Sequence, residues 1–430
     1  MRADDPFRDR YARGTRAMTA SEIRALFAVA SRPEVVSLAG GMPFTAALPF
    51  DVVGDVVDEV LAEEGPSALQ YAGGQGDPRL REVLTELMRH EGIRGSGGDV
   101  VVTEGSQQAL DLLARMFCDP GDVIVAEGPS YVGALSAFSQ YQVEVCHVPL
   151  DDEGIDPDSL ADTLTRLERD GRRVKFLYTV PNFHNPAGVT LAAGRRDRVV
   201  ELARRHNVLI LEDNPYGMLG FENDPPDALR ARDPDNVVYL GTLSKVFCPG
   251  LRVGWALVPP ALRERLVLVK EAADLCSSSF TQAVAYRWFA GYPWRETLKA
   301  LRDVYRERRD AILDALAEDF PAGVTWTKPA GGFYVWARLP DQLDSRAMLA
   351  KAITARVAYV PGGAFYADGQ GASCLRLSYC FPPPERIREG VRRLGGVVEE
   401  ELDLLRALGG VPTADPEDDP GRPAGWGGVQ

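Results

Sequence analysis

The sequence has few of the residues that build metal centres and disulfide networks. Its 430 residues include only four histidines and six cysteines. No two cysteines form a C-x-x-C pair, and no histidine-rich stretch lies beside any of them. Zinc sites and disulfide scaffolds are recognised in sequences by such spacings. We therefore expect neither a metal site nor a disulfide network, and a reducing compartment fits this composition.

The sequence also lacks a long apolar run and an excess of basic residues. No window approaches the roughly 18 apolar residues that a membrane span requires. Residues 1–16 alternate charges instead of forming the apolar centre of a signal peptide. The formal net charge of −14 disfavours nucleic acid as a partner. These absences predict a soluble cytoplasmic protein that binds neither membranes nor nucleic acid.

Short apolar runs rich in Val, Ile and Leu alternate with longer amphipathic stretches from about residue 50 to 285. This pattern is typical of an α/β fold with a mainly parallel sheet flanked by helices. Seven strands are predicted, at residues 99–103, 122–127, 142–148, 174–179, 208–212, 237–241 and 252–258.

A chain of 430 residues is too long for one small core, so we expect two domains. Residues 49–290 form the large α/β domain in this interpretation, and residues 291–410 form a smaller α+β domain. Residues 1–48 contribute to the small domain and to the active site. Residues 411–430 are rich in Pro, Gly and Asp and are predicted to be disordered.

A lysine in a glycine-rich turn is the clearest chemical signal. Lys245 follows a predicted strand within Gly241-Thr-Leu-Ser-Lys-Val-Phe-Cys-Pro-Gly-Leu-Arg-Val-Gly254. An isolated lysine is most often a solvated surface residue, but an apolar strand and tight turns imply partial burial here. Burial disfavours the ammonium form and lowers its pKa, as an imine-forming lysine requires.

Asp213 and Tyr216 follow another predicted strand, in Val208-Leu-Ile-Leu-Glu-Asp-Asn-Pro-Tyr216. Parallel strands bind ligands at their carboxyl ends, so these residues should share a crevice with Lys245. A carboxylate there can keep a pyridine nitrogen protonated through a bond of about 1.5–3 kcal/mol. Tyr216 can donate to the phenolic oxygen of the same ring. Without the lysine motif, an N-cap aspartate beside a packed tyrosine would be an equally good interpretation.

An anion pocket is predicted where Thr103-Glu-Gly-Ser-Gln-Gln108 joins a strand to a helix, because the first amides of a helix are free. Hydroxyl and guanidinium groups near Lys245 can add donors suited to phosphate. A helix cap is the commoner role of such a motif taken alone. The predicted phosphate ligands are Gly105, Ser106, Gln107, Thr242, Ser244 and Arg252.

Other residues suggest the rest of a pocket. Asn185 lies in Pro181-Asn-Phe-His-Asn-Pro-Ala-Gly188 and can reach the phenolic oxygen, although an ordinary turn is the default for this motif. Tyr131 offers a face for stacking on a ring. Arg376, inside an apolar strand, is either an edge charge or a bidentate carboxylate clamp. His184 could be a base, but it is more often a residue that supports a neighbouring site residue or packs in the core.

The order and spacing of these motifs resemble the fold-type I, class I/II aminotransferases from about residue 20 to 408. The motifs are Gln70-Tyr71, Gly73-Gly74-Gln-Gly76, Glu104-Gly-Ser-Gln107, Asn185-Pro-Ala-Gly188, Asp213-Asn-Pro-Tyr216, Ser244-Lys245 and Pro249-Gly-Leu-Arg252. The resemblance implies pyridoxal 5'-phosphate held on Lys245 as a Schiff base. It also implies Asp213 at the pyridine nitrogen, and Asn185 with Tyr216 at the phenolic oxygen.

The same resemblance implies that Tyr131 stacks on the ring and that Arg376 and Asn185 grip the substrate α-carboxylate. Tyr71 matches a residue that reaches the phosphate of the neighbouring subunit, which predicts a homodimer.

Ser21-Glu-Ile-Arg24 and Ser37-Leu-Ala-Gly-Gly41-Met-Pro43 most resemble the 2-aminoadipate, kynurenine and broad-range aromatic or branched-chain branch. This places Gly41 in the substrate site and Arg24 at a distal carboxylate, with an exposed helix charge as the alternative for Arg24. The predicted function is ping-pong transfer of an amino group to a 2-oxo acid such as 2-oxoglutarate or pyruvate. The expected donor is an L-amino acid: 2-aminoadipate, aromatic, branched-chain or glutamate.

Three alternatives stand beside this prediction. A lyase or decarboxylase could use the same cofactor and fold. A nicotinamide dehydrogenase shares the alternating strands and helices, but Gly74-Gln-Gly76 is followed by Arg79 where the fingerprint needs a third glycine. A non-catalytic protein could retain the cofactor as structure, although no predicted cofactor ligand is missing.

Overall fold

The computed structural model describes residues 5–18 and 32–409. Its large sheet has eight strands in the order β2-β9-β8-β7-β6-β3-β4-β5. Their bounds are β2 (Val100–Glu104), β3 (Val123–Gly128), β4 (Glu144–Asp151), β5 (Gly154–Ile155), β6 (Val174–Thr179), β7 (Leu209–Asp213), β8 (Val237–Thr242) and β9 (Val253–Leu257). Neighbours from β8 to β4 run parallel, whereas β9 is antiparallel to β2 and to β8. The α/β fold with a mainly parallel sheet is confirmed.

The eighth strand was not expected from the sequence. β5 has two residues and pairs antiparallel with the end of β4, after a turn in which Gly154 has φ +92°. Two residues are too few to produce an alternation of polar and apolar side chains. The seven predicted strands all exist, with ends shifted by up to three residues.

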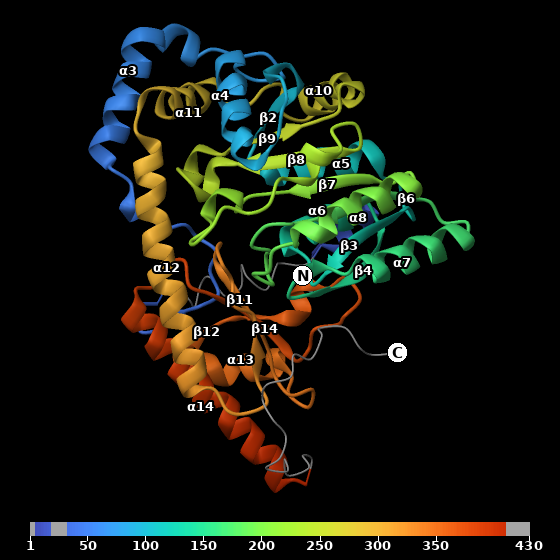
Figure 1. Ribbon diagram of the computed structural model, residues 1–430, viewed down its shortest axis with the longest axis vertical. Coiled ribbons are helices and arrows are strands. Elements are labelled where there is room, and N and C mark those ends of the chain that lie inside the picture. Colours follow the sequence, from blue (N-terminus) through green and yellow to red (C-terminus); the bar gives the residue numbers. More distant parts are fainter. Residues whose placement is uncertain (1–4, 19–31, 410–430) are drawn as a thin grey trace.

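Helices cover the large sheet and cap its upper edge (Figure 1). They are α3 (Phe50–Ala68), α4 (Pro78–Met88), α5 (Ser106–Phe117), α6 (Val132–Ser139), α7 (Pro157–Arg169), α8 (Ala193–Arg205), α9 (Leu229–Arg232), α10 (Pro260–Asp274) and α11 (Ser279–Gly291). α7 shows why such segments form helices: Asp156 caps its first amides, and its leucines at positions 160, 164 and 167 are buried on one face.

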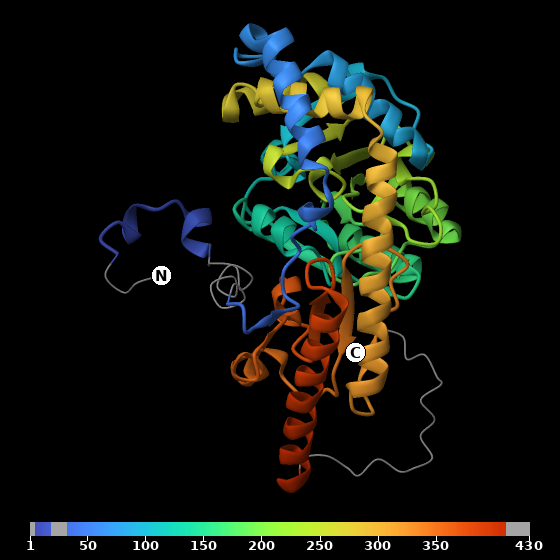
Figure 2. The same cartoon turned by 90° about the vertical axis from the view of Figure 1, so that its left-hand side faces the viewer.

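A second, four-stranded antiparallel sheet lies below the large one, in the order β10-β11-β14-β13. Its strands are β10 (Thr325–Trp326), β11 (Tyr334–Arg338), β13 (Val360–Pro361) and β14 (Cys374–Ser378). The helices around it are α12 (Trp294–Asp319), α13 (Ser345–Thr354) and α14 (Pro384–Ala407). Figure 2 shows α12 running from the upper helices down beside α14, and so linking both parts of the fold.

One strand of the N-terminal part of the chain meets this lower region. β1 (Val36–Ser37) pairs in parallel with β12 (Val357–Ala358), while the short helix α1 spans Arg13–Ala17. The predicted domain boundaries stay predictions, and the predicted disordered tail lies outside the described residues. Within residues 5–18 and 32–409, no helix has the length and apolar character needed to cross a membrane.

Candidate active site

A cavity of about 650 Å³ lies where the carboxyl ends of the central strands face β11 and β14. Its wall includes most of the residues predicted from the sequence: Gly41, Gly105, Ser106, Gln107, Tyr131, Asn185, Asp213, Tyr216, Thr242, Ser244, Lys245, Arg252 and Arg376. Two predicted site residues are not in this wall. Tyr71 lies on the surface of the subunit, and Arg24 lies outside the described residues.

Lys245 projects into the cavity from the short helix η6 (Leu243–Lys245), which follows β8. Its Nζ donates a hydrogen bond to the carbonyl oxygen of Gly41 over 3.3 Å. Burial of the amino group lowers the pKa of Lys245, and the positive charges of Arg376 and Arg252 lower it further. Asp213 acts in the opposite direction. A lowered pKa increases the fraction of neutral amine, the form that acts as a nucleophile and base.

Asp213 ends β7 with only 2% of its surface exposed. Its Oδ2 accepts a hydrogen bond from the Tyr178 hydroxyl over 2.9 Å, whereas its Oδ1 is buried with no hydrogen-bond partner among the described residues. Burial raises the pKa of Asp213 to about 7, and the bond from Tyr178 opposes this rise. A buried acceptor without a partner is costly. It therefore fits a ligand that brings an N–H donor, as a protonated pyridine ring does.

Arg376 lies in the middle of β14 and is 2% exposed. Its Nη1 donates to Asn185 Oδ1 over 2.9 Å, and its Nη2 donates to the Ala39 carbonyl over 2.7 Å. The guanidinium also lies over the Tyr334 ring, 4.3 Å from the ring centroid. No described acidic side chain forms an ion pair with it. A buried guanidinium held by neutral groups fits a ligand carboxylate.

The residues of the predicted anion pocket lie together between α5 and the turn after β8. Gly105 has φ +75°, and a Cβ atom there would meet the guanidinium of Arg252. α5 starts directly afterwards at Ser106, so its first amides are open to the cavity. Thr242 Oγ1 donates to Ser244 Oγ over 3.0 Å, which adds two hydroxyl groups to the same wall. These donors fit a phosphate group.

Two predicted tyrosines complete the wall. The Tyr131 hydroxyl donates to Gln107 Oε1 over 3.4 Å, and Gln107 is fixed in turn by a bond to the Gly133 carbonyl. The Tyr216 hydroxyl lies 3.5 Å from that of Tyr334. Burial raises the pKa of Tyr131 to about 12 and holds the pKa of Tyr216 well above its usual value, so both hydroxyls keep their protons and can donate.

Sequence reasoning missed several residues of this site. Tyr178 lies within a predicted strand, and the signal was a tyrosine in an otherwise apolar buried run, whose hydroxyl needs a partner. Met42 and Pro43 line the cavity within a motif from which only Gly41 was predicted as a site residue, and Phe381 lines it without any motif that would identify it.

The chain is similar to known proteins over most of its length. The family model for aminotransferase class I and II matches residues 34–394. Aromatic-amino-acid aminotransferase 1 of Thermococcus litoralis is 44% identical over 387 residues, which cover 90% of this chain and 93% of the relative.

Two solved structures are also similar. Pyrococcus horikoshii kynurenine aminotransferase, in complex with PMP, has a TM-score of 0.88 at 40% identity and covers 91% of this chain and 97% of its own. The α-aminoadipate aminotransferase of Thermus thermophilus, complexed with N-(5'-phosphopyridoxyl)-L-leucine, has a TM-score of 0.85 at 36% identity, with coverages of 92% and 99%. The chain belongs to the class I and II aminotransferases and is a transaminase that depends on pyridoxal phosphate.

Proposed function

We propose that this aminotransferase prefers L-amino acids with aromatic or other apolar side chains as donors and passes the amino group to a 2-oxo acid. The observation that carries this proposal is the cavity wall beyond Lys245, where Met42, Pro43, Tyr334 and Phe381 present apolar surface. Among the described lining residues, the other cationic side chains are Arg252, at the phosphate pocket, and Arg376. Apart from Lys245, Arg252 and Arg376, the described lining residues include no cationic side chain that could bind a second carboxylate.

A donor with a distal carboxylate, such as 2-aminoadipate or glutamate, would need a cation from another segment. Arg24, predicted for that role, lies outside the described residues. We rank such donors second because Met42, Pro43 and Phe381 make the described wall beyond Lys245 apolar. The named relatives include an aromatic-amino-acid aminotransferase, a kynurenine aminotransferase and an α-aminoadipate aminotransferase, so each donor class has a precedent in a similar protein.

The proposed mechanism assigns each step to residues of this cavity. Bound pyridoxal phosphate supplies an electron sink that weakens the Cα–H bond of the attached amino acid. Asp213 keeps the proton on the ring nitrogen, and its burial strengthens that charge interaction. Arg376 and Asn185 hold the α-carboxylate and so fix the rotation of the substrate. Lys245 would be the base that takes the proton from the substrate Cα and the acid that later returns it.

The family and the named relatives are aminotransferases, and none of them favours a lyase or decarboxylase. Arg376 suits transamination, because a decarboxylase must instead place the carboxylate bond perpendicular to the ring. Gly74 and Gly76, the glycines that suggested a nicotinamide dehydrogenase, do not line the cavity, so the cavity gives no support to that alternative.

The donor preference can be measured from the absorbance of the purified holoenzyme. We expect a band near roughly 410–430 nm that decays toward about 330 nm when phenylalanine, tyrosine or leucine is added. The second-order rate constant of decay should be at least about 10-fold higher for these donors than for glutamate or 2-aminoadipate. Burial of an apolar donor side chain against the apolar wall stabilises the transition state by an amount that corresponds to such a ratio. Faster decay with the dicarboxylic donors would contradict the proposal, and a persistent band would exclude every donor tested.

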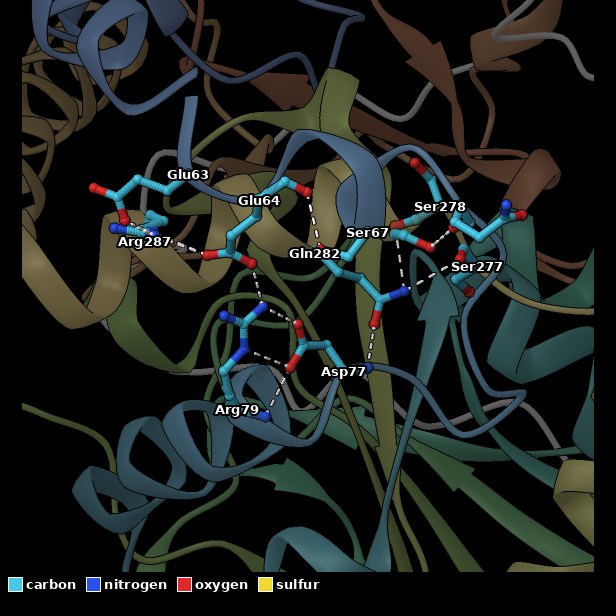
Figure 3. A network of polar contacts seen from close by, with 11 residues as sticks. Glu63, Glu64, Ser67, Asp77, Arg79, Ser277, Ser278, Gln282 and Arg287 are labelled. Atoms are coloured by element: carbon cyan, nitrogen blue, oxygen red, sulfur yellow. Dashed lines mark hydrogen bonds and ion pairs between the residues drawn. The ribbon is translucent and has the colours of Figure 1, made fainter. Parts of the chain in front are cut away.

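We further propose a cytoplasmic homodimer in which Tyr71 reaches the phosphate pocket of the partner subunit. Tyr71 is 78% exposed, and Leu69, Leu268 and Leu275 are exposed as well. Leu69 and Tyr71 line one surface hollow. A soluble monomer rarely leaves large apolar residues exposed together, so a second copy is the expected cover. The polar network in Figure 3 fixes the loop that follows Tyr71: Gln282 Oε1 accepts the Asp77 amide over 2.8 Å.

Mixing two inactive variants tests this arrangement. Tyr71→Ala should weaken the partner's phosphate pocket, and Lys245→Ala should remove the reacting lysine. In a hybrid dimer, one site then has an intact Lys245 and receives Tyr71 from the other subunit. One of the two sites in each hybrid dimer is intact, so pure hybrids should show about half of the parental activity. Random pairing of equal amounts makes about half of the dimers hybrids, so the unseparated mixture should show about a quarter. Activity no higher than that of the separate variants would exclude Tyr71 as a shared residue, and sedimentation reports the oligomeric state independently.

A further inference from the structure

A buried carboxylate at the end of β3 has no role in the mechanism above. Glu127 is 1% exposed. Its Oε1 accepts a hydrogen bond from the Thr179 hydroxyl over 2.7 Å, and its Oε2 accepts one from the Val180 amide over 2.8 Å. No lysine or arginine among the described residues forms an ion pair with it. Burying an acidic group without a cationic partner costs folding free energy, which these hydrogen bonds only partly offset.

The third neighbour of this carboxylate is His184, also 1% exposed. Its Nε2 lies 3.1 Å from Glu127 Oε2, off the straight hydrogen-bond line, and has no other partner among the described residues. Its Nδ1 accepts the Ala187 amide over 3.1 Å. Because Nδ1 is an acceptor, the proton of the neutral ring lies on Nε2, the nitrogen that is 3.1 Å from Glu127 Oε2.

The backbone of His184 also organises the turn that carries Asn185. The His184 amide donates to the Val189 carbonyl over 2.8 Å, and the Gly188 amide donates to the His184 carbonyl over 2.6 Å. The ring, the amide and the carbonyl of His184 therefore each form a hydrogen bond within the turn. Its ring is also the contact that ties this turn to the carboxylate at the end of β3.

Glu127 and His184 join three segments that each supply one residue to the cavity wall. Tyr131 follows Glu127 by four residues, Val180 donates its amide to Glu127, and Asn185 follows His184. Neither Glu127 nor His184 lines the cavity. The contacts run from Glu127 through His184 to the Asn185 turn, and from Asn185 Oδ1 to Arg376 Nη1 over 2.9 Å.

We propose that Glu127 and His184 are a pair of positioning residues that set Asn185, and through it Arg376, for the substrate carboxylate. This inference rests on the proposed role of Asn185. Removing the pair deletes no group that touches substrate or cofactor, and the expected effect is a shift of the clamp formed by Asn185 and Arg376. Misplacing a positioned group by 1 Å can cost about 10²-fold in rate or affinity, so a small shift is measurable.

Two substitutions at His184 separate its two contacts. His184→Asn retains an acceptor near the Nδ1 position but does not reach Glu127. His184→Gln retains a donor near the Nε2 position. Glu127→Gln and Thr179→Val change the other side of the contact without altering the turn. His206→Asn is the matched control, because His206 contacts Glu168 over 2.9 Å outside the cavity.

The readouts are KM and kcat of each holoenzyme for phenylalanine, and inhibition by 3-phenylpropionate, which carries the carboxylate but no amino group. For His184→Asn we expect KM and the inhibition constant to rise about 10-fold together, as loss of one charge-assisted contact predicts, while kcat falls less than about 3-fold. His184→Gln should recover most of the loss, and His206→Asn should match the parent. The visible band of the bound cofactor should persist in every variant.

Unchanged KM and inhibition constants in His184→Asn and Glu127→Gln, beside a lowered melting temperature, would overturn the positioning role and leave a purely structural pair. If His184→Asn does not fold, the same comparison is made with Glu127→Gln and Thr179→Val. Asn185→Ala separates this inference from the proposal beneath it. If Asn185→Ala leaves KM unchanged, the assumed role of Asn185 fails; if it raises KM and the pair variants do not, only the positioning inference fails.

Discussion

Replacing Lys245 with alanine is expected to remove nearly all multiple-turnover transamination. The substitution removes the amino group that we propose as the attachment point of the cofactor and as the base, and whose pKa is lowered by burial. General acid–base catalysis alone contributes about 10²–10⁴-fold, so the loss of kcat should be at least that large. Steady-state assays with phenylalanine and 2-oxoglutarate measure it, and the absorbance spectrum should lose the band of the lysine-bound cofactor.

Lys351→Ala is the control for this experiment. Lys351 is exposed on α13, outside the cavity wall, and pairs with Glu401 on α14. Surface pairs of this kind contribute about 0–1 kcal/mol, so the control should retain both band and rate. Repeated turnover by Lys245→Ala, with the control intact, would show that another residue performs the proton transfer.

The fold was predictable because a sheet buried on both faces requires near-continuous apolar strands. The β6 strand, Val174–Thr179, was predicted to the residue. The direction of β9 was not, since an apolar run reads the same in either orientation. β5 escaped prediction because only two residues pair there.

Site residues could be predicted from the sequence only where a single short segment contained the whole motif. Lys245 and Asp213 each follow a strand, and parallel topology brings such ends together. Arg376 had two interpretations, and its partner Asn185 lies 191 residues away in the chain. The contact of Glu127 with His184 depends on how β3 and the turn after β6 meet, which no short spacing encodes. Long-range register decides such contacts.

Asp213→Asn is expected to slow the holoenzyme by about 10²-fold, the size of effect seen when one preorganised electrostatic contact is removed. The amide has the shape of the carboxylate and still accepts from Tyr178, but it has no negative charge to keep the ring nitrogen protonated. Single-turnover decay of the cofactor band with saturating phenylalanine measures the chemical step. Asp156→Asn is the control, because asparagine caps α7 as well as aspartate does. Equal rates for parent and Asp213→Asn would remove Asp213 from the mechanism.

The same Asp213→Asn substitution is expected to stabilise the cofactor-free protein at pH 8 while leaving its stability near pH 4 unchanged. Burial raises the pKa of Asp213 from 3.8 to about 7, so folding favours its protonated form. The stability from this group is present below its unfolded pKa and is lost as pH rises to about 7, by at most on the order of 4 kcal/mol. Glu91, whose pKa burial raises to about 8, changes in the same direction in both proteins and cancels in the difference. Thermal unfolding at pH 4, 6 and 8 tests this. If the melting temperatures of the two proteins changed with pH in the same way, the ionised Asp213 carboxylate would not destabilise the cofactor-free fold. The argument that this carboxylate is kept for a protonated ring nitrogen would then fail.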